Sequence, residues 1–150
     1  MARWVIDENI FHIASNPNND QCSEAIYFTE TIYKFHLLVL DHEGKLMDKY
    51  RKLFALSKLL RIWFTKINKN AGHVVYCTSN LTQAIESKLD QLGFDPDDKC
   101  FVGASLNADN IISSEDGDFK KQPVYNYFTN DLRLTILTLN ESASEEAKMR

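Results

Sequence analysis

Short apolar runs alternate along the chain with longer segments in which apolar residues recur every three or four positions. The apolar runs predict buried strands, because a strand covered on both faces reads as a continuous hydrophobic run. The periodic segments predict helices that pack one face against a sheet. The expected strands are residues 3–6, 36–40, 73–77, 111–112 and 132–139. The expected helices are residues 10–14, 23–35, 45–69, 81–92 and 98–105.

This alternation predicts an α/β protein with three layers, α/β/α, around a mostly parallel central sheet of about five strands. The pattern does not give the order of the strands. A length of 150 residues is enough for one domain with a core of its own. We expect the domain to span residues 1–140 and residues 141–150 to form a frayed tail.

Composition restricts the class of protein further. The chain is 44% hydrophobic and 25% charged, as is usual for a globular protein. No apolar run approaches the roughly 20 residues that cross a membrane, and we expect no signal peptide because a strand begins almost at the N-terminus. The three cysteines and four histidines lack the spacing of a zinc site. These features predict a cytoplasmic protein without a membrane segment.

The net charge of −4 hides an uneven distribution. Residues 45–70 contain eight Lys or Arg and one acid, so this segment carries about +7 and the remainder about −11. A basic helix beside an acidic pocket suits a metal-dependent enzyme that acts on a polyanion. Arg51, Lys58 and Lys69 share one side of the expected helix and are the candidate phosphate contacts. The alternative is a solvated helix face.

Carboxylates follow two expected strands and begin one expected helix. Asp7 comes directly after residues 3–6, Asp98 begins the helix of residues 98–105, and residues 114–118 follow a late strand with three acids. In an open α/β sheet, ligands bind outside the carboxyl ends of the strands. Crowded carboxylates repel one another and need a neutralising cation. Oxygen ligands of this kind favour Mg²⁺ or Mn²⁺.

Three motifs in this order resemble the PIN-domain nuclease family. They are D-x-N at Asp7, Asp98 followed by Phe101 and Ala104, and S-x-D-x-D-F beginning at Ser114. The resemblance covers nearly the whole chain, because the elements between the motifs also fit in order and spacing. The fold that it implies agrees with the α/β pattern.

The resemblance also implies roles for individual residues and an activity. The catalytic positions would be Asp7, Asp48, Asp98, Ser114 and Asp116, and the metal ligands would be Asp7, Asp98, Asp116 and Asp118. Asp48 stands where the family more often has Glu, so we expect it to reach the metal only through water. Ser114 stands where Thr is usual and keeps the hydroxyl group. The implied activity is Mg²⁺- or Mn²⁺-dependent endonucleolytic hydrolysis of single-stranded or structured RNA.

The implied partners are an antitoxin protein that covers the site, if the chain is the toxin of a toxin–antitoxin pair, and a second copy in a homodimer. Two other classes stay open. One is a catalytically degenerate PIN-like domain that binds nucleic acid or protein without cutting it. The other is a receiver-type phosphoacceptor domain, which lacks a convincing partner lysine here.

Some of the acids also have purely structural interpretations. Asp98 could serve only as a helix N-cap, with Asp97 as its rival for the site. Asp48 could simply pair with Lys52 on a solvated surface.

Overall fold

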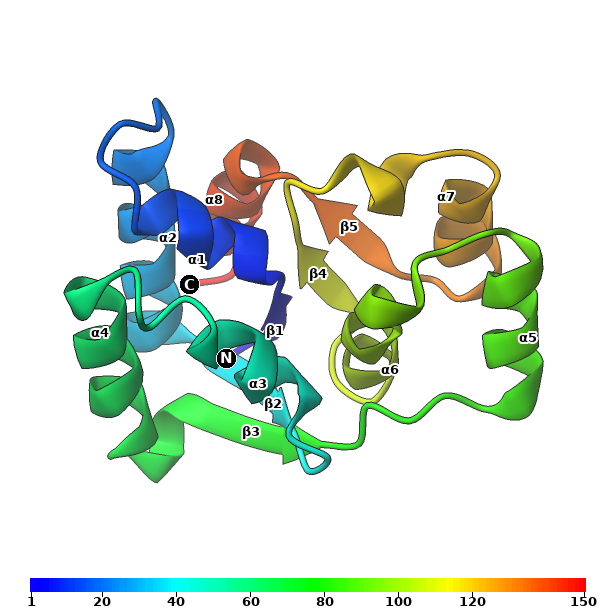
Figure 1. Cartoon of the computed structure of the whole chain (residues 1–150), viewed down its shortest axis with the longest axis horizontal. Coiled ribbons are helices and arrows are strands. Elements are labelled where there is room, and N and C mark those ends of the chain that lie inside the picture. The colour runs from blue at the N-terminus through cyan, green and yellow to red at the C-terminus, as the bar shows by residue number, and fades with distance from the viewer.

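A five-stranded sheet runs through the centre of the protein, and all neighbouring strands in it are parallel (Figure 1). The computed structural model describes residues 1–150. The strands are β1 (Arg3–Ile6), β2 (Leu37–Asp41), β3 (Val74–Cys77), β4 (Ile111–Ser113) and β5 (Thr135–Leu137). Their order is β3-β2-β1-β4-β5, which places β1 in the middle. The predicted α/β class with a parallel central sheet is confirmed.

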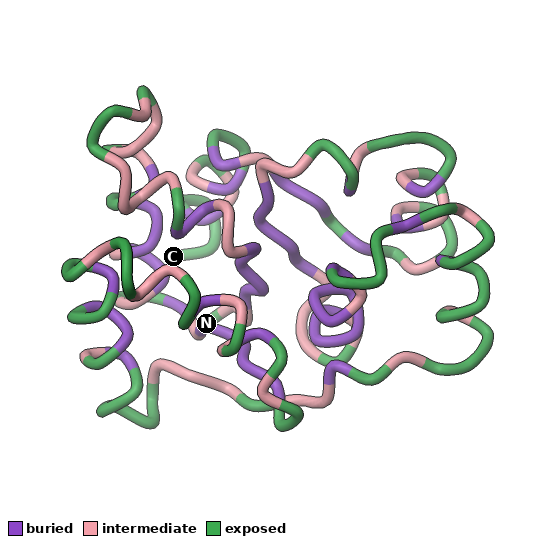
Figure 2. The backbone as a smooth tube through the Cα atoms, viewed as in Figure 1, coloured by how far each residue is buried: buried purple, intermediate pink, exposed green.

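Eight α-helices surround this sheet. They are α1 (Glu8–Ala14), α2 (Cys22–Phe35), α3 (Lys45–Arg51), α4 (Lys58–Asn68), α5 (Gln83–Gln91), α6 (Lys99–Leu106), α7 (Val124–Asn126) and α8 (Leu139–Lys148). Helix α2 packs against β2 and α8, whereas α6 packs against β1, β2 and β4. The central strands and the helix faces turned toward them are buried, whereas the edge strand β3 is only partly buried, as Figure 2 shows. No helix is long and apolar enough to cross a membrane.

The register of β1 and β4 decides which side of the sheet receives each residue. Ile6 pairs with Ser113, and Val5 pairs with Ile112. The Oγ of Ser113 lies 2.7 Å from the Oγ of Ser142 in α8, so this pair faces α8. Because side chains alternate between the faces of a strand, the next residue after each strand turns toward the α6 side. The ends of β1 and β4 therefore present their first loop residues to the same crevice.

The long helix expected over residues 45–69 is two helices. Helix α3 ends at Arg51 and α4 begins after Ser57, whose Oγ accepts a hydrogen bond from the N–H of Leu60 at 3.2 Å. A serine N-cap satisfies a free helical N–H and starts a new helix. The break folds α4 back, so that Phe64 packs on Tyr50 with ring centroids 5.2 Å apart.

The expected frayed tail is wrong, because residues 139–148 form α8. Thr138 and Glu141 make a capping box at its start, a T-x-x-E signal present in the sequence. Glu146 is buried, and its Oε1 lies 3.2 Å from Nε2 of the buried His36. Arg150 Nε donates to the same carboxylate at 2.9 Å. Burial alone would raise the pKa of Glu146, but these hydrogen bonds bring it below its ordinary value.

Candidate active site

The carboxyl ends of β1 and β4 bring two of the three acidic motifs together. Asp7 follows β1 directly, and its N–H donates to the carbonyl of Ser113 at 2.9 Å. The segment from Ser114 to Asp116 follows β4, which is hydrogen-bonded to β1. Asp98 comes from the start of α6, which packs on both strands. The three segments that carry these acids therefore lie at one edge of the sheet, and we call this place the crevice.

Asn9 and Ser114 tie the first and last motifs into one hydrogen-bonded unit. Asp7 is 2% exposed and accepts a hydrogen bond from Ser114 Oγ at 2.7 Å. Ser114 Oγ in turn accepts from the N–H of Asp116 at 2.9 Å. The side chain of Asn9 accepts from the N–H of Glu115 at 3.2 Å. These contacts fix the position of the Asp7 carboxyl group and limit its rotation.

The acids of the crevice affect one another's ionisation. Burial, followed by the neighbouring Glu8 carboxyl group and then Asp98, raises the pKa of Asp7 to about 9, although the Ser114 hydroxyl opposes this. The pKa of Asp98 rises to about 6 through burial, which the charge of Lys49 opposes, with further increases from Glu8 and Asp116. The crevice therefore holds more carboxyl groups than it can keep ionised at low cost.

Two residues of the crevice, Glu8 and Lys49, are not among the predicted site residues. Lys49 Nζ lies 3.8 Å from Oε1 of Glu8 and 3.7 Å from Oδ1 of Asp98. The other carboxylate oxygen of Glu8 is buried without a hydrogen-bond partner. The sequence does hold a signal for Lys49, because it lies three residues after the buried Leu46 and so on the inner side of α3.

Asp98, and not its rival Asp97, faces the crevice. Asp98 is 6% exposed, whereas Asp97 is exposed. The side chain of Asp98 makes no capping hydrogen bond to α6, so the N-cap interpretation does not account for its burial. Its carboxylate instead faces Lys49.

Asp48 does not join the other acids. Its side chain is 70% exposed, and its Oδ1 accepts a hydrogen bond from Arg51 Nη1 at 3.2 Å. The helix turns Leu46 and Tyr50 into the core, which leaves Asp48 on the outer side. Arg51, an expected phosphate contact, is therefore engaged by Asp48.

The remaining predicted residues lie at the margin or away from the crevice. Asp118 is exposed, and its N–H donates to Oδ1 of Asp116 at 2.9 Å. This bond caps the 3₁₀ turn Gly117–Lys120, so a turn role is part of what Asp116 does. Lys58 and Lys69 lie on α4, at its N-terminal end and just beyond its C-terminal end.

The oxygen donors of the crevice are of the type that a hard divalent cation prefers, but they are too far apart to hold one. The crevice offers carboxylate oxygens and one buried oxygen of Glu8 without a partner, which is what Mg²⁺ or Mn²⁺ requires. No group of three or more His, Cys, Asp or Glu side chains stands close enough to hold a metal ion as placed. The cation that does lie among these acids is the ammonium group of Lys49.

A polar cleft of about 760 Å³ borders the crevice on the Lys49 side. Helix α3 contributes lysines to one wall, and the segments after β3 and before α6 contribute to the other. The lining residues are Lys45, Asp48, Lys49, Lys52, Ser79, Asn80, Leu81, Glu86, Pro96, Asp97, Lys99 and Cys100. Lys99 is paired with Asp90 at 2.5 Å, whereas Lys45 and Lys52 are exposed and make no ion pair.

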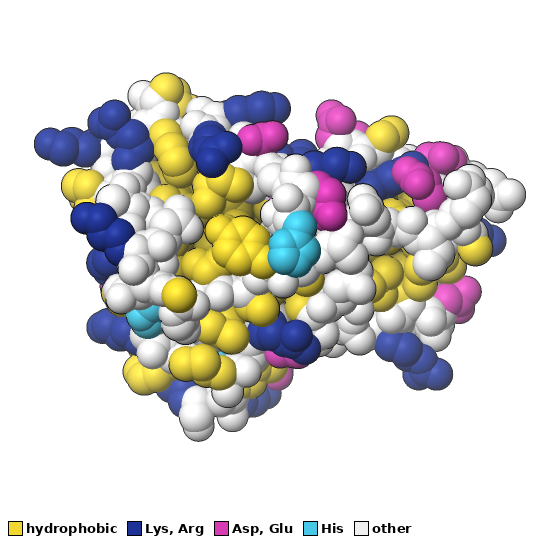
Figure 3. Space-filling view, turned by 90° about the horizontal axis from the view of Figure 1, so that it is seen from below, with side chains coloured by type: hydrophobic (Ala, Val, Ile, Leu, Met, Phe, Trp, Pro, Cys, Tyr) yellow, Lys and Arg dark blue, Asp and Glu magenta, His cyan; other side chains and the backbone are white.

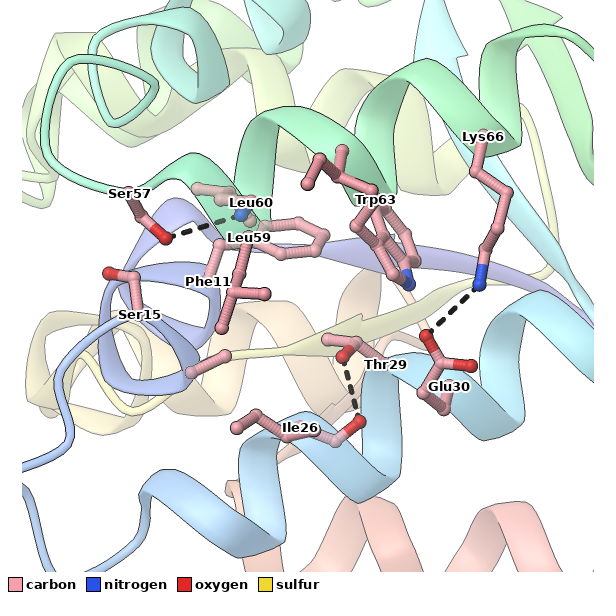
Figure 4. Close-up of a pocket in the computed structure, with 12 residues that line it drawn as sticks. Phe11, Ser15, Ile26, Thr29, Glu30, Ser57, Leu59, Leu60, Trp63 and Lys66 are labelled. Carbon is pink, nitrogen blue, oxygen red and sulfur yellow. Dashed lines mark hydrogen bonds and ion pairs between the residues drawn. The ribbon is translucent and has the colours of Figure 1, made fainter.

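A second hollow, which we call the apolar groove, lies between α1, α2 and α4 and has a volume of about 210 Å³ (Figure 4). Ile26, Leu59 and Ile62 line it although each is more than 40% exposed. Trp63 also lines it, and its Nε1 is buried without an acceptor. In Figure 3 Lys and Arg side chains stand along the end of the molecule that α2 and α4 form, beside a broad hydrophobic patch.

The parallel sheet of five strands, in the order β3-β2-β1-β4-β5 with helices around it, is an α/β fold. The structure is similar to the crystal structure of VapBC2 from Rickettsia felis bound to a DNA fragment from their promoter. The TM-score is 0.54 at 12% sequence identity, over 91% of this chain and 98% of that chain. No family model and no curated protein sequence matches the chain. At this identity the likeness shows the fold, and the PIN-like fold is confirmed.

Proposed function

We propose that the protein is a PIN-like nuclease that hydrolyses phosphodiester bonds of RNA with the help of Mg²⁺ or Mn²⁺. One observation carries the proposal: Asp7, Asp98 and Asp116 lie at the carboxyl edge of the central strands with Glu8 beside them, and burial together with these neighbouring acids raises the pKa values of Asp7 and Asp98. Such a concentration of carboxyl groups destabilises a fold unless it serves a cation or a reaction. The PIN-like fold supports the same conclusion.

The roles of the chain's own residues follow from this geometry. Asp7, Asp98 and Asp116 would hold the cation, which supplies charge neutralisation and an activated water. Asp118, exposed beside Asp116, would contribute through water. Ser114 holds the Asp7 carboxyl group in place. Burial raises the pKa of Asp98 to about 6, so Asp98 is mostly ionised at neutral pH and its carboxylate is available to a cation.

A degenerate PIN-like domain that binds nucleic acid without cutting it is the second candidate. The observation that favours it is Lys49, whose ammonium group already lies 3.7 Å from Asp98 and 3.8 Å from Glu8. A permanent lysine there would neutralise the acids without any metal.

A cleavage assay separates the two candidates. The purified protein is incubated with mixed RNA and single-stranded DNA substrates in EDTA, Mg²⁺ or Mn²⁺. The nuclease predicts endonucleolytic cleavage of RNA that depends on the metal and is stopped by EDTA. RNA binding without cleavage in any of the three buffers would support the degenerate domain instead.

We further propose that the phosphates of the RNA bind along the polar cleft and not along α4. Lys45 and Lys52 are exposed there, free of ion pairs, and stand on the helix that carries Lys49 into the crevice. A phosphate chain in this cleft would lead directly to Asp98. The earlier expectation of Arg51, Lys58 and Lys69 is less favourable, because Arg51 pairs with Asp48 and the other two flank α4.

Neutralising the cleft should flatten the salt dependence of RNA binding. The double variant Lys45→Gln/Lys52→Gln should lower the log–log slope by about 1.4, at about 0.7 for each lost phosphate contact on a single strand. The matched control Lys58→Gln/Lys69→Gln removes the same charge from α4 and should leave the slope unchanged. Fluorescence anisotropy at several salt concentrations measures both, and the opposite ranking would assign the phosphates to α4.

A protein partner completes the proposal, since the structural neighbour is a toxin–antitoxin complex. The apolar groove exposes Ile26, Leu59 and Ile62, and a basic surface borders it in which only Lys66 pairs with an acid, Glu30. That surface comprises Lys58, Arg61, Thr65, Lys66 and Lys69. An antitoxin segment that folds as an amphipathic helix, with apolar residues on one face and acids beside them, would complement both features.

Designed helical peptides test this partner chemistry. A peptide with Leu at helical spacing and Glu on its flanks should bind the protein, and its affinity should fall as salt rises. The same peptide with Lys in place of Glu should bind at least about tenfold more weakly. Ile62→Asp should abolish binding of the acidic peptide, because it places a carboxylate in the apolar groove. Ile26 stays unchanged in this variant. Equal binding of both peptides would remove the charge argument.

A further inference from the structure

Lys49 is a cation placed inside a group of acids. Its Nζ lies 3.8 Å from Glu8 and 3.7 Å from Asp98, and 5.4 Å from the ring centroid of Phe101. The side chain is only 17% exposed. Burial lowers the pKa of Lys49, but the charges of Glu8, Asp98 and Asp7 bring it above the ordinary value, so the ammonium group stays charged.

We propose that Lys49 is the resident counter-cation of the crevice and competes directly with the divalent cation for Glu8 and Asp98. The inference rests on the proposed function, because the divalent cation belongs to that function. In this arrangement Lys49 stabilises the metal-free protein, and the metal binds only when the lysine withdraws.

The contacts of Lys49 permit such a withdrawal. Both carboxylate distances are longer than 3.5 Å, so the ammonium group is held by charge and not by a directional hydrogen bond. Lysine has a flexible four-carbon stem. Lys49 also borders the polar cleft of about 760 Å³, which has room for the displaced side chain. The lysine can therefore leave the acids without moving α3.

The competing interpretation is a permanent ion pair that holds α3 against α1 and α6. Both interpretations predict that removing the charge destabilises the metal-free protein. They differ in what the metal then does. A competitor predicts tighter metal binding without Lys49, whereas a permanent structural pair predicts no gain.

The test compares Lys49→Met with Lys34→Met by calorimetric titration with Mn²⁺ in the absence of nucleic acid. Methionine keeps the apolar stem over Phe101 and removes the charge. Lys49→Met should bind Mn²⁺ at least about tenfold more tightly than the unmodified protein, as expected for the loss of a competing ion pair worth about one power of ten. Lys34 is exposed on α2 and makes no ion pair, so Lys34→Met should leave Mn²⁺ affinity unchanged.

Thermal melting provides a second readout. Without metal, the Tm of Lys49→Met should fall below that of the unmodified protein, and saturating Mn²⁺ should raise it more in the variant than in the unmodified protein. If methionine prevents folding, Lys49→Gln carries the same comparison with a polar side chain.

Unchanged or weaker Mn²⁺ binding by both Lys49 variants would overturn the inference, as would failure of every protein to bind Mn²⁺. Cleavage is scored separately. Tighter binding in the variants with no cleavage by any protein would leave the inference standing and remove the nuclease. Metal-dependent cleavage by the unmodified protein, without tighter Mn²⁺ binding in the variants, would support the nuclease and overturn the inference about Lys49.

Discussion

Replacing Asp7 with asparagine should raise the free energy of unfolding by about 2–4 kcal/mol at pH 7 in metal-free buffer, since one pKa unit corresponds to about 1.4 kcal/mol. Asp7 is 2% exposed, and burial beside Glu8 raises its pKa to about 9. Asparagine is neutral at every pH and still suits the N-cap of α1, which Asp7 occupies. The substitution therefore removes the cost of placing a carboxyl group there and keeps the cap.

The pH dependence gives this prediction its sign. Between the unfolded pKa of about 4 and the folded pKa of about 9, the folded state keeps a proton that the unfolded state has lost. The stability of the unmodified protein should therefore fall as pH rises through this window, and Asp7→Asn should remove most of that slope.

Urea denaturation between pH 4.5 and pH 8.5 in EDTA measures both quantities. Asp118→Asn is the matched control, because Asp118 is an exposed aspartate of the same crevice margin. It should change the free energy of unfolding by less than about 0.5 kcal/mol. Parallel pH curves for the unmodified protein and Asp7→Asn would show that Asp7 ionises normally.

The elements of the fold could largely be predicted from the sequence, because hydrophobic periodicity depends on neighbouring positions alone. The run at residues 36–40 corresponds to β2, and the brief apolar pair at 111–112 to β4. Two predictions, the single helix over residues 45–69 and the frayed tail, were wrong because the local pattern fits more than one structure. The periodic segment 45–69 continues through a break at Ser57, and the polar segment 141–150 forms α8 once Thr138 caps it.

The order of the strands could not be predicted, because it depends on contacts between distant segments. Gly103 illustrates such a contact: a Cβ there would lie 1.8 Å from the carbonyl oxygen of Ser79, so only glycine allows α6 to approach the end of β3 so closely. The residues around Gly103 do not predict this close approach of α6 to the end of β3.

The site, too, could be predicted from the sequence only in part. Asp7 and Ser114 lie side by side, because each directly follows a strand whose end the pattern located. Lys49 was not predicted as a site residue, because the excess of basic residues around it favoured a role at the surface. Whether a helical residue faces a pocket or solvent depends on how its helix is oriented, and that is fixed by packing.

Asp98 faces the crevice and Asp48 faces solvent, so we expect Asp98→Asn and Asp48→Asn to differ sharply in RNA cleavage. Asp98 is 6% exposed and lies in the crevice beside Lys49. If its carboxylate holds the cation and accepts the proton of the attacking water, asparagine should lower kcat by about 10²–10⁴-fold, the usual contribution of a positioned base. The fold should remain intact, since the side chain makes no capping hydrogen bond to α6.

Asp48→Asn should change kcat by less than about twofold, because a side chain that is 70% exposed and paired with Arg51 contributes little. Single-turnover cleavage of one RNA at saturating Mn²⁺ compares the two variants, and circular dichroism confirms that both are folded. A loss in Asp48→Asn equal to that in Asp98→Asn would mean that α3 turns during the reaction and brings Asp48 to the metal through water. Normal cleavage by Asp98→Asn would show that Asp98 neither holds the cation nor accepts the proton.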